Sequence, residues 1–306
     1  MEPFWYFVPI IWLWFNIQSF ENIFWGVSSL CNFGVLFFSL LAFYFASFHP
    51  NKLGYALLFA LIATFTYGNG LMSFPIIGGV CLLSGQRKGF FFTLVAAAIV
   101  AGIYFIDFTP ITQNLNFRNP KEVKSGIMGF FGFLGSIVTI AAYPGNPTYL
   151  TIAVVFGVLI IATLLFLFRN QWKDIWVALL KNKPYSNQVA IFSISLVVFI
   201  VITAAALTYK RISMDHFEGM FKGRYRMYST LLCITVYFAF LSLTRSNIIR
   251  KALPVILVSS IILNLAILQR NFLDAVNNRR DAIAQEFNAR YNVDWNGTRM
   301  FSMTQE

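Results

Sequence analysis

The stretch Thr148–Phe168 decides the fold: it reads TYLTIAVVFGVLIIATLLFLF and contains no charged residue. About 20 such apolar residues cross the hydrocarbon core of a bilayer as an α-helix. Outward from this stretch, the uncharged region covers residues 126–168, and a second uncharged region covers residues 23–48. Uncharged runs of this length predict helices that are surrounded by lipid.

The composition of the whole chain leads to the same class of protein. Of the 306 residues, 58% are hydrophobic and 11% are charged, and the mean hydropathy is +0.67. A soluble domain carries about a quarter charged residues, so a soluble enzyme is excluded. Lipid cannot satisfy free backbone groups, and long apolar runs without alternation do not suit barrel strands. The sequence therefore predicts an all-α, polytopic transmembrane protein.

The apolar runs predict about nine spans. The first, third and fourth are short for a full crossing, so we expect them to be re-entrant, packed behind other helices or matched by local thinning of the bilayer. Residues 130–142 form only about two-thirds of a span before Pro144 and Pro147, which predicts a re-entrant or interfacial segment. The nine predicted spans cover residues 4–17, 25–47, 53–67, 70–83, 89–106, 148–168, 189–209, 227–243 and 252–268.

The end of the chain has a different pattern. Between residues 272 and 291, apolar side chains recur at spacings of four and seven and charged residues occupy the other faces. This pattern is typical of an amphipathic helix that lies on the membrane interface or packs on the protein. We therefore divide the chain into a transmembrane domain, residues 1–269, and an amphipathic tail on the outer side, residues 270–306. The apolar positions of the tail helix are Phe272, Val276, Ile283, Phe287 and Tyr291.

The formal net charge of +11 does not indicate a nucleic-acid partner. The basic residues lie in short loops and in the tail, a distribution that predicts contact with membrane lipids. They are divided almost evenly between the two sides, so the orientation signal is weak. If the N-terminus is cytoplasmic, the loops 86–88, 169–183 and 245–251 share the inner side, and Arg224 and the tail lie on the outer side.

Metal and disulfide chemistry find little support in the sequence. Cys31, Cys81 and Cys233 lie inside apolar segments, and His49 and His216 are far apart, so we predict no disulfide framework and no metal site. No cofactor is certain, and a divalent cation is left open. The predicted spans contain no ionisable residue apart from cysteine and tyrosine, and for Asn32 and Asn264 we expect hydrogen bonds between helices. Chemistry is therefore expected at the outer ends of the helices.

The segment 210–226 is the first candidate site. It carries five basic residues together with Asp215, His216 and Glu218, and it leads into an apolar span. A helix N-terminus with arginines beside it favours phosphate, whereas the alternative is that the basic side chains only anchor the helix at the headgroups. The residues predicted to bind a lipid phosphate are Lys210, Lys222, Arg224, Tyr225 and Arg226.

Two further features are expected on the same outer side. Tyr67-Gly-Asn-Gly-Leu-Met-Ser-Phe-Pro75 interrupts an apolar region, which predicts a non-helical turn at Gly68, Asn69, Gly70 and Pro75 with antiparallel segments on either side. An unwound segment at membrane depth is the alternative. The candidates for a general base are carboxylates, and each of them is alternatively an interfacial charge. These carboxylates, which the sequence does not rank, are Asp215, Glu218, Asp107 and Glu21.

Three of these stretches resemble bacterial membrane glycosyltransferases of the GT-C type. Phe20-Glu-Asn-Ile-Phe-Trp-Gly26 is similar to the "weNllwGfq" stretch that precedes a long span in that family. Thr64-Phe-Thr-Tyr-Gly-Asn-Gly-Leu-Met-Ser-Phe-Pro75 resembles the "tfsfgnGLlvwP" turn, and Gly223-Arg-Tyr225 resembles the "sRY" at the head of a late span. The resemblance implies an inverting enzyme of the bacterial inner membrane that uses a polyprenyl-phosphate-linked sugar.

The resemblance also has a gap. The presumed catalytic aspartate of that family lies in a first outer loop, and this chain has no Asp before Asp107. We therefore expect the C-terminal portion of a divided or truncated enzyme, with another membrane chain supplying the missing region, or a chain that has lost the chemistry. The expected activity is transfer of the sugar to an envelope glycan, lipid or protein. A non-catalytic membrane subunit and a lipid-linked glycan transporter or polymerase are the alternatives.

Overall fold

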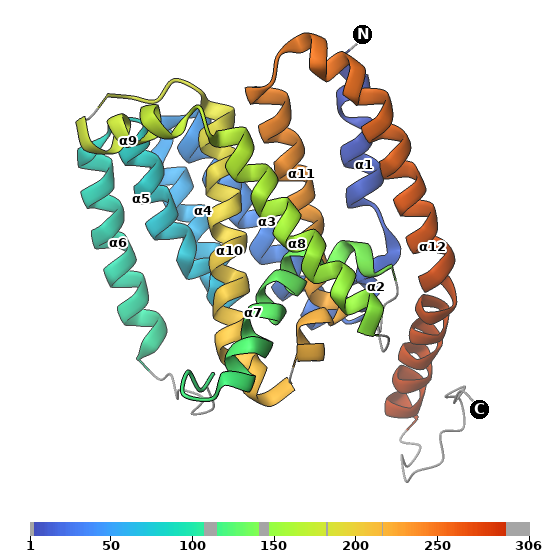
Figure 1. The fold of residues 1–306 in the computed structure, drawn as a ribbon. Helices are drawn as coiled ribbons and strands as arrows, with labels where there is room; N and C mark the ends of the chain where they lie inside the picture. The colour runs from blue at the N-terminus through green and yellow to red at the C-terminus, as the bar shows by residue number, and fades with distance from the viewer. Residues whose placement is uncertain (1–2, 107–114, 141–146, 182, 216, 292–306) are drawn as a thin grey trace.

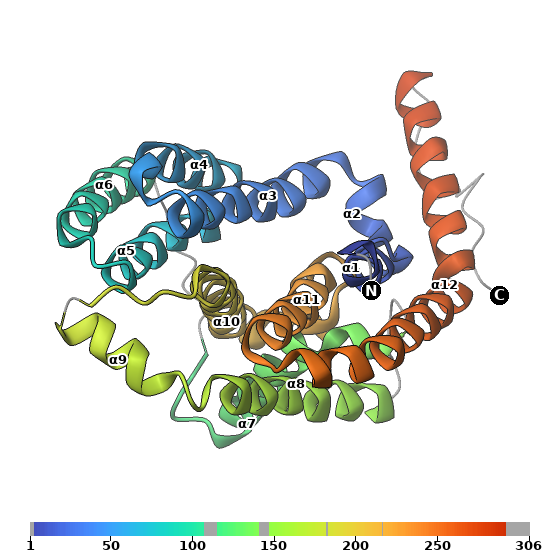
Figure 2. The ribbon, with the colours of Figure 1, turned by 90° about the horizontal axis from the view of Figure 1, so that it is seen from above.

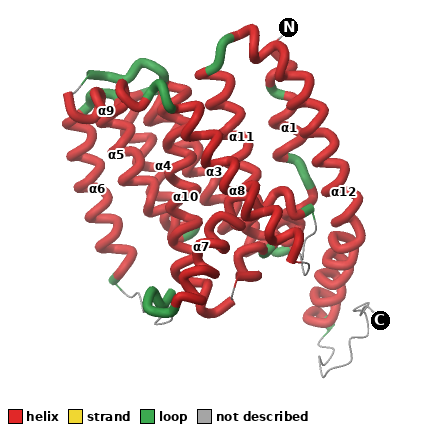
Figure 3. Tube along the Cα trace, viewed as in Figure 1, coloured by secondary structure: helices red, strands yellow, loops and turns green. Residues whose placement is uncertain are grey.

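The computed structural model describes residues 3–106, 115–140, 147–181, 183–215 and 217–291, and these residues form helices with no strand among them (Figures 1 and 3). Six of the described helices are long and apolar enough to cross a membrane, by length and composition. They indicate an integral membrane protein. The six are α3 (Gly26–Phe48), α6 (Arg87–Phe105), α8 (Pro147–Phe168), α10 (Gln188–Asp215), α11 (Arg226–Leu243) and α12 (Ser246–Arg290).

Three of the nine predicted spans are too short to cross on their own. These are α1 (Val8–Trp14), α4 (Leu53–Thr66) and α5 (Ser73–Leu83), with 7, 14 and 11 residues. The longest of them measures about 21 Å, less than the roughly 30 Å of a bilayer core. Six of the nine predicted spans are thus candidate spans by length and composition, and the other three are those already short in the sequence.

Short helices connect these elements. Three of them are α-helices: α2 (Phe20–Phe24), α7 (Pro120–Gly135) and α9 (Trp172–Lys181). The remaining short elements are 3-10 helices: η1 (Pro3–Tyr6), η2 (Ile17–Ser19), η3 (Pro50–Lys52), η4 (Gly68–Met72), η5 (Ser136–Thr139), η6 (Phe217–Phe221) and η7 (Gly223–Tyr225).

The long helices run up and down between two ends of the bundle. The turn into α6, the helix α9 and the α11–α12 turn lie at one end, which we call the α9 end (Figure 1). The start of α7 and the last turns of α12 lie at the opposite end. The three basic loops expected to share a side are therefore at one end of the bundle, as the alternation of spans predicts.

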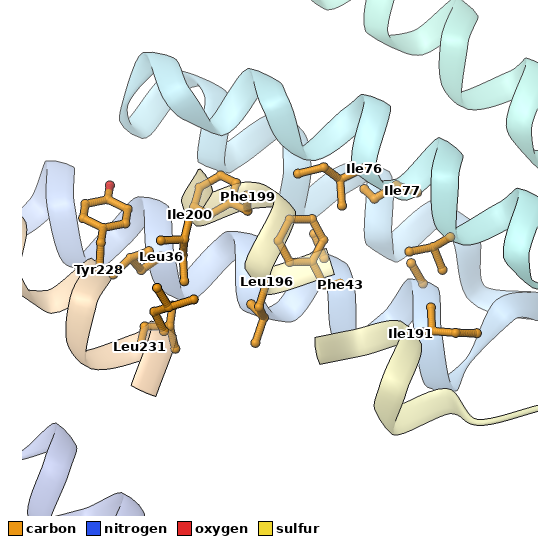
Figure 4. Packing of buried hydrophobic residues seen from close by; sticks show 14 of the residues in the cluster. Leu36, Phe43, Ile76, Ile77, Ile191, Leu196, Phe199, Ile200, Tyr228 and Leu231 are labelled. Carbon is orange, nitrogen blue, oxygen red and sulfur yellow. The ribbon is translucent and has the colours of Figure 1, made fainter. Parts of the chain in front are cut away.

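The core lies where α10 joins two groups of helices. Seen from above, α3–α6 form one group, α1, α7, α8, α11 and α12 form another, and α10 stands between them (Figure 2). Leu36 and Phe43 of α3 pack there against Phe199 of α10, with Ile77 of α5 and Leu231 of α11 in the same cluster (Figure 4). The Phe43 and Phe199 rings meet edge to face at 5.7 Å between centroids, an arrangement that aromatic pairs favour.

The segment expected to be re-entrant is helical where it is described. It forms the end of α7 and then η5, while residues 141 and 142 lie outside the described residues. Glycine lets α7 pack closely on α8: a Cβ at Gly135 would meet the Ala153 carbonyl, and one at Gly157 would meet the Phe131 carbonyl. Such small residues allow two backbones to approach in a membrane.

The expected division at residues 269 and 270 falls inside one helix. The 45 residues of α12 continue without a break through this position, so its length is about 68 Å. A helix twice as long as a bilayer core is thick extends well beyond a single crossing. The predicted amphipathic tail helix is the last part of α12.

Candidate functional site

Three segments that are distant in the sequence enclose a cleft of about 540 Å³. One wall comes from α2 and the residue after it, the second from the segment around η7, and the third from the last turns of α12. We call it the α2–α12 cleft. Its lining residues are Glu21, Phe24, Trp25, Lys222, Arg224, Asn278, Asp281, Ala282 and Gln285.

The first two walls are joined by Glu21 and η7. The backbone N–H of Arg224 donates to Oε2 of Glu21 at 3.2 Å. Gly223 permits this approach, because a Cβ there would lie 3.1 Å from Cδ of Glu21. A glycine is therefore favoured at this position of the Gly223-Arg-Tyr225 motif for steric reasons. The close approach that it permits places Glu21 beside Arg224.

The buried Asn22 also joins α2 to η7. Asn22 is fully buried, and its Nδ2 donates to the carbonyl of Arg224 at 3.0 Å. Its Oδ1 accepts from Oγ of Ser28 at 2.7 Å and from Nδ2 of Asn32 at 3.2 Å. Asn32 thus makes the inter-segment hydrogen bond that was expected of it, and so does Asn264, whose Nδ2 donates to the carbonyls of Trp12 and Phe15.

Arg224 lies between aromatic rings at the cleft. Its Cζ is 5.9 Å from the Trp25 ring centroid and 5.2 Å from that of Tyr225, within the range of a cation–π contact. The side chain is half-buried, and its Nε is buried without a hydrogen-bond partner. Lys222 lines the same cleft. The cleft therefore holds two cations beside two carboxylates, Glu21 and Asp281.

Three residues predicted to bind phosphate do not line this cleft. Arg226 is fully buried, and its Nε and one terminal nitrogen donate to the Phe221 carbonyl at 3.3 and 3.2 Å. Tyr225 is 2% exposed. Lys210 lies on α10, with its Nζ 5.6 Å from the Tyr209 ring centroid. The guanidinium of Arg226 therefore lies inside the protein, and neither the predicted phosphate contact nor the alternative of an anchor at the headgroups fits this position.

The four candidate carboxylates can be compared only in part. Glu21 lines the cleft. Asp107 lies outside the described residues, and the structure describes the backbone of Asp215 and Glu218 without their side chains. Among the described residues, no group of three or more His, Cys, Asp and Glu side chains could hold a metal ion.

The predicted outer turn is a helix break with a different local shape. α4 ends at Thr66, Tyr67 is extended with φ −158° and ψ 139°, and η4 follows. The break is confirmed, but the non-helical turn is wrong: Gly68, Asn69 and Gly70 lie in a 3-10 helix, and Pro75 lies in the first turn of α5. Proline fits there because first-turn N–H groups have no partner within the helix.

The turn packs against the helix that follows η7. Nδ2 of Asn69 donates to the Tyr228 hydroxyl at 3.0 Å and to Oγ1 of Thr203 at 3.3 Å. Burial raises the pKa of Tyr67, and the nearby Arg211 and Arg224 act in the opposite direction. The motif around Asn69 and the Gly223-Arg-Tyr225 motif are thus neighbours.

Sequence reasoning missed the third wall of the cleft. Asn278, Asp281 and Gln285 line it from α12, and their spacing of three and four places them on one helical face. Of the apolar positions of this helix, Phe272, Ile283, Phe287 and Tyr291 are all at least 46% exposed. These four side chains are therefore not packed inside the described part of the protein. The spacing of the polar residues was the signal that could have identified the wall.

Comparison of the chain with protein-family profiles, with curated proteins and with solved structures gives no match in any of the three. The class of protein defined by the fold is an all-α protein with six candidate membrane spans. Functional inference therefore rests on the cleft itself.

Proposed function

We propose that the α2–α12 cleft binds the headgroup of a polyprenyl-phosphate-linked sugar, and that the protein is a GT-C-like glycosyltransferase, or the C-terminal part of one, of the bacterial inner membrane. One observation carries the proposal: Arg224 and Lys222 line the cleft together with Glu21 and an exposed tryptophan, Trp25. Cations suit the phosphate. An aromatic ring and two amide side chains suit a sugar, which offers both apolar faces and hydroxyl groups.

In the proposed reaction, Glu21 is the general base, and the basic residues of the cleft stabilise the leaving phosphate. An acceptor hydroxyl attacks the anomeric carbon of the sugar while the bond from that carbon to the phosphate oxygen breaks. Glu21 takes the hydroxyl proton as general base. Polyprenyl phosphate leaves with its charge against Arg224 and Lys222, which stabilise it electrostatically.

The binding step is tested with undecaprenyl phosphate and native mass spectrometry of the purified protein. Replacing Arg224 with Gln removes a charge-assisted contact, so we expect a loss of about 1.5–3 kcal/mol in affinity. Arg224→Lys should lose part of this, because lysine cannot form the planar, two-point contact with phosphate. Arg118→Gln is the matched control, since Arg118 is exposed and does not line the cleft. Equal lipid retention in the wild type and both Arg224 variants would contradict the proposal.

A non-catalytic membrane subunit is the second candidate, and the hydrogen bond from Arg224 N–H to Glu21 favours it. This contact gives Glu21 a structural task that needs no reaction. Glu21→Gln separates the two, because glutamine still accepts the hydrogen bond but cannot take the proton. The enzyme proposal predicts retained lipid binding with sugar transfer lost, measured with isolated membranes and the natural lipid pool. Unchanged transfer would remove Glu21 as the base.

A further inference from the structure

A second hollow, of about 330 Å³, lies between α7, α8, α9 and α10. All of its lining residues are apolar, and we call it the α8–α10 groove. On α8 the lining extends from Ile161 to Phe168, a distance of about 10 Å along the helix axis. Trp172 and Ile175 of α9 border it at the α9 end of the bundle. The groove therefore begins near one membrane surface and continues toward the bilayer interior.

The groove is open to the surroundings of the protein. Leu165 is 54% exposed, Trp172 is 44% exposed and Val198 is 37% exposed. Both long walls, α8 and α10, are candidate membrane spans. The medium in contact with such helices is acyl chains, so the chemistry of the groove fits a hydrocarbon chain.

Basic side chains accompany the end of the groove at α9. Arg169 directly follows the lining residue Phe168, Lys173 directly follows Trp172, and both are exposed. Cζ of Arg169 lies 3.8 Å from the ring centroid of Phe166, an exposed residue of α8 beside the groove lining. Lys181 and Lys183 add positive charge on this segment, and Asp174 is its one acidic residue. This end therefore has a net positive charge.

The helix α9 is held in place at this end. Ile175 and Ala178 are buried, whereas Trp172 and Trp176 are exposed, as in a helix that lies at the interface. The Tyr185 hydroxyl donates to Oε1 of Gln171 at 2.9 Å, and the Tyr185 N–H donates to the Leu83 carbonyl at 2.8 Å. Tyr185 thus joins the start of the basic segment, at Gln171, to the end of α5, at Leu83.

We propose that the α8–α10 groove seats one acyl chain of an anionic glycerophospholipid, with the lipid phosphate against Arg169 and Lys173. Charge selects the headgroup, because basic pockets between membrane helices bind anionic lipids. This site is separate from the α2–α12 cleft in residues and in ligand, so it stands whether or not the protein transfers a sugar.

The test measures lipid retained by the purified protein after equilibration with vesicles of equal parts phosphatidylglycerol and phosphatidylcholine, by native mass spectrometry. The wild type should retain phosphatidylglycerol in preference. The double variant Arg169→Gln, Lys173→Gln should lower its affinity for phosphatidylglycerol roughly twenty-fivefold, from about fivefold per basic residue. Val198→Trp should lower retention of both lipids, because the indole fills the groove at a partly exposed position.

The control double variant Arg87→Gln, Lys88→Gln removes the same charge at the α9 end, from exposed residues at the start of α6. It should change phosphatidylglycerol retention less than about twofold. An equal loss in both double variants would overturn the site in favour of general attraction to the membrane. Wild-type retention in Val198→Trp would overturn the groove as the seat. Leu165→Trp replaces Val198→Trp if the latter does not elute as a single species.

Discussion

At the residue scale, the junction of α2 and η7 depends on the amide of Asn22. This side chain satisfies the Arg224 carbonyl, Ser28 and Asn32 at once. A buried amide with three partners holds an irregular segment in one position, because each partner would be left without a hydrogen bond if it moved. The position of Arg224 in the cleft thus depends on a residue that contacts no proposed ligand.

Replacing Asn22 with leucine should destabilise the protein by about 1–3 kcal/mol, because buried polar groups lose their partners. The measurement is thermal unfolding of the detergent-purified protein. Asn170→Ala at an exposed asparagine is the control, with an expected change within about 0.5 kcal/mol. If both variants unfold at the wild-type temperature, the Asn22 network does not support the fold.

The residue scale also shows where sequence reasoning stopped. Arg224 and Arg226 carry the same charge in the same motif, and the sequence predicted one role for both. Arg224 lies in the 3-10 helix η7, whereas Arg226 is the first residue of α11, so the two side chains start from different elements. Arg224 lines the cleft and Arg226 is fully buried. Charge alone does not reveal which of the two is turned inward.

At the scale of elements, the crossing of α7 and α8 explains how a short helix is accommodated in the bundle. Gly135 and Gly157 sit where the two backbones meet, so that a Cβ on either would reach a carbonyl of the other helix. The sequence predicted the apolar character of this region but not its partner, because glycine spacing does not identify the helix that packs on it. For α12, likewise, the sequence predicted an amphipathic helix but did not identify α2 as the element that its polar face meets.

Gly157→Ala should therefore force α7 and α8 apart and destabilise the protein by about 1–3 kcal/mol, the usual cost of overpacking. Gly102→Ala in α6 is the matched control, because a Cβ there meets nothing within 4 Å. Thermal unfolding of the two variants, compared with the wild type, measures the difference. Equal stability of the two variants would mean that the close approach of α7 and α8 is not required.

At the scale of the whole molecule, the lengths and order of the apolar runs were enough to predict the six long helices and their alternation. The sequence did not predict that residues 21, 224 and 281 line one cleft. Their proximity depends on the last part of α12, which lies beside α2 with its polar face toward the cleft. The resulting molecule has polar features at both ends: the α2–α12 cleft near one end and the basic α9 segment at the other.

Binding of polyprenyl phosphate at the α2–α12 cleft can be measured by site-specific photocrosslinking in native membranes. A photoreactive amino acid replaces Gln285, which lines the cleft, or Trp176, an exposed residue of α9. The probe is radiolabelled undecaprenyl phosphate, and crosslinked protein is counted after purification. Binding at the cleft should give crosslinking at position 285 that falls when Arg224→Gln is added, and little crosslinking at position 176. Equal crosslinking at both positions, unaffected by Arg224→Gln, would contradict it.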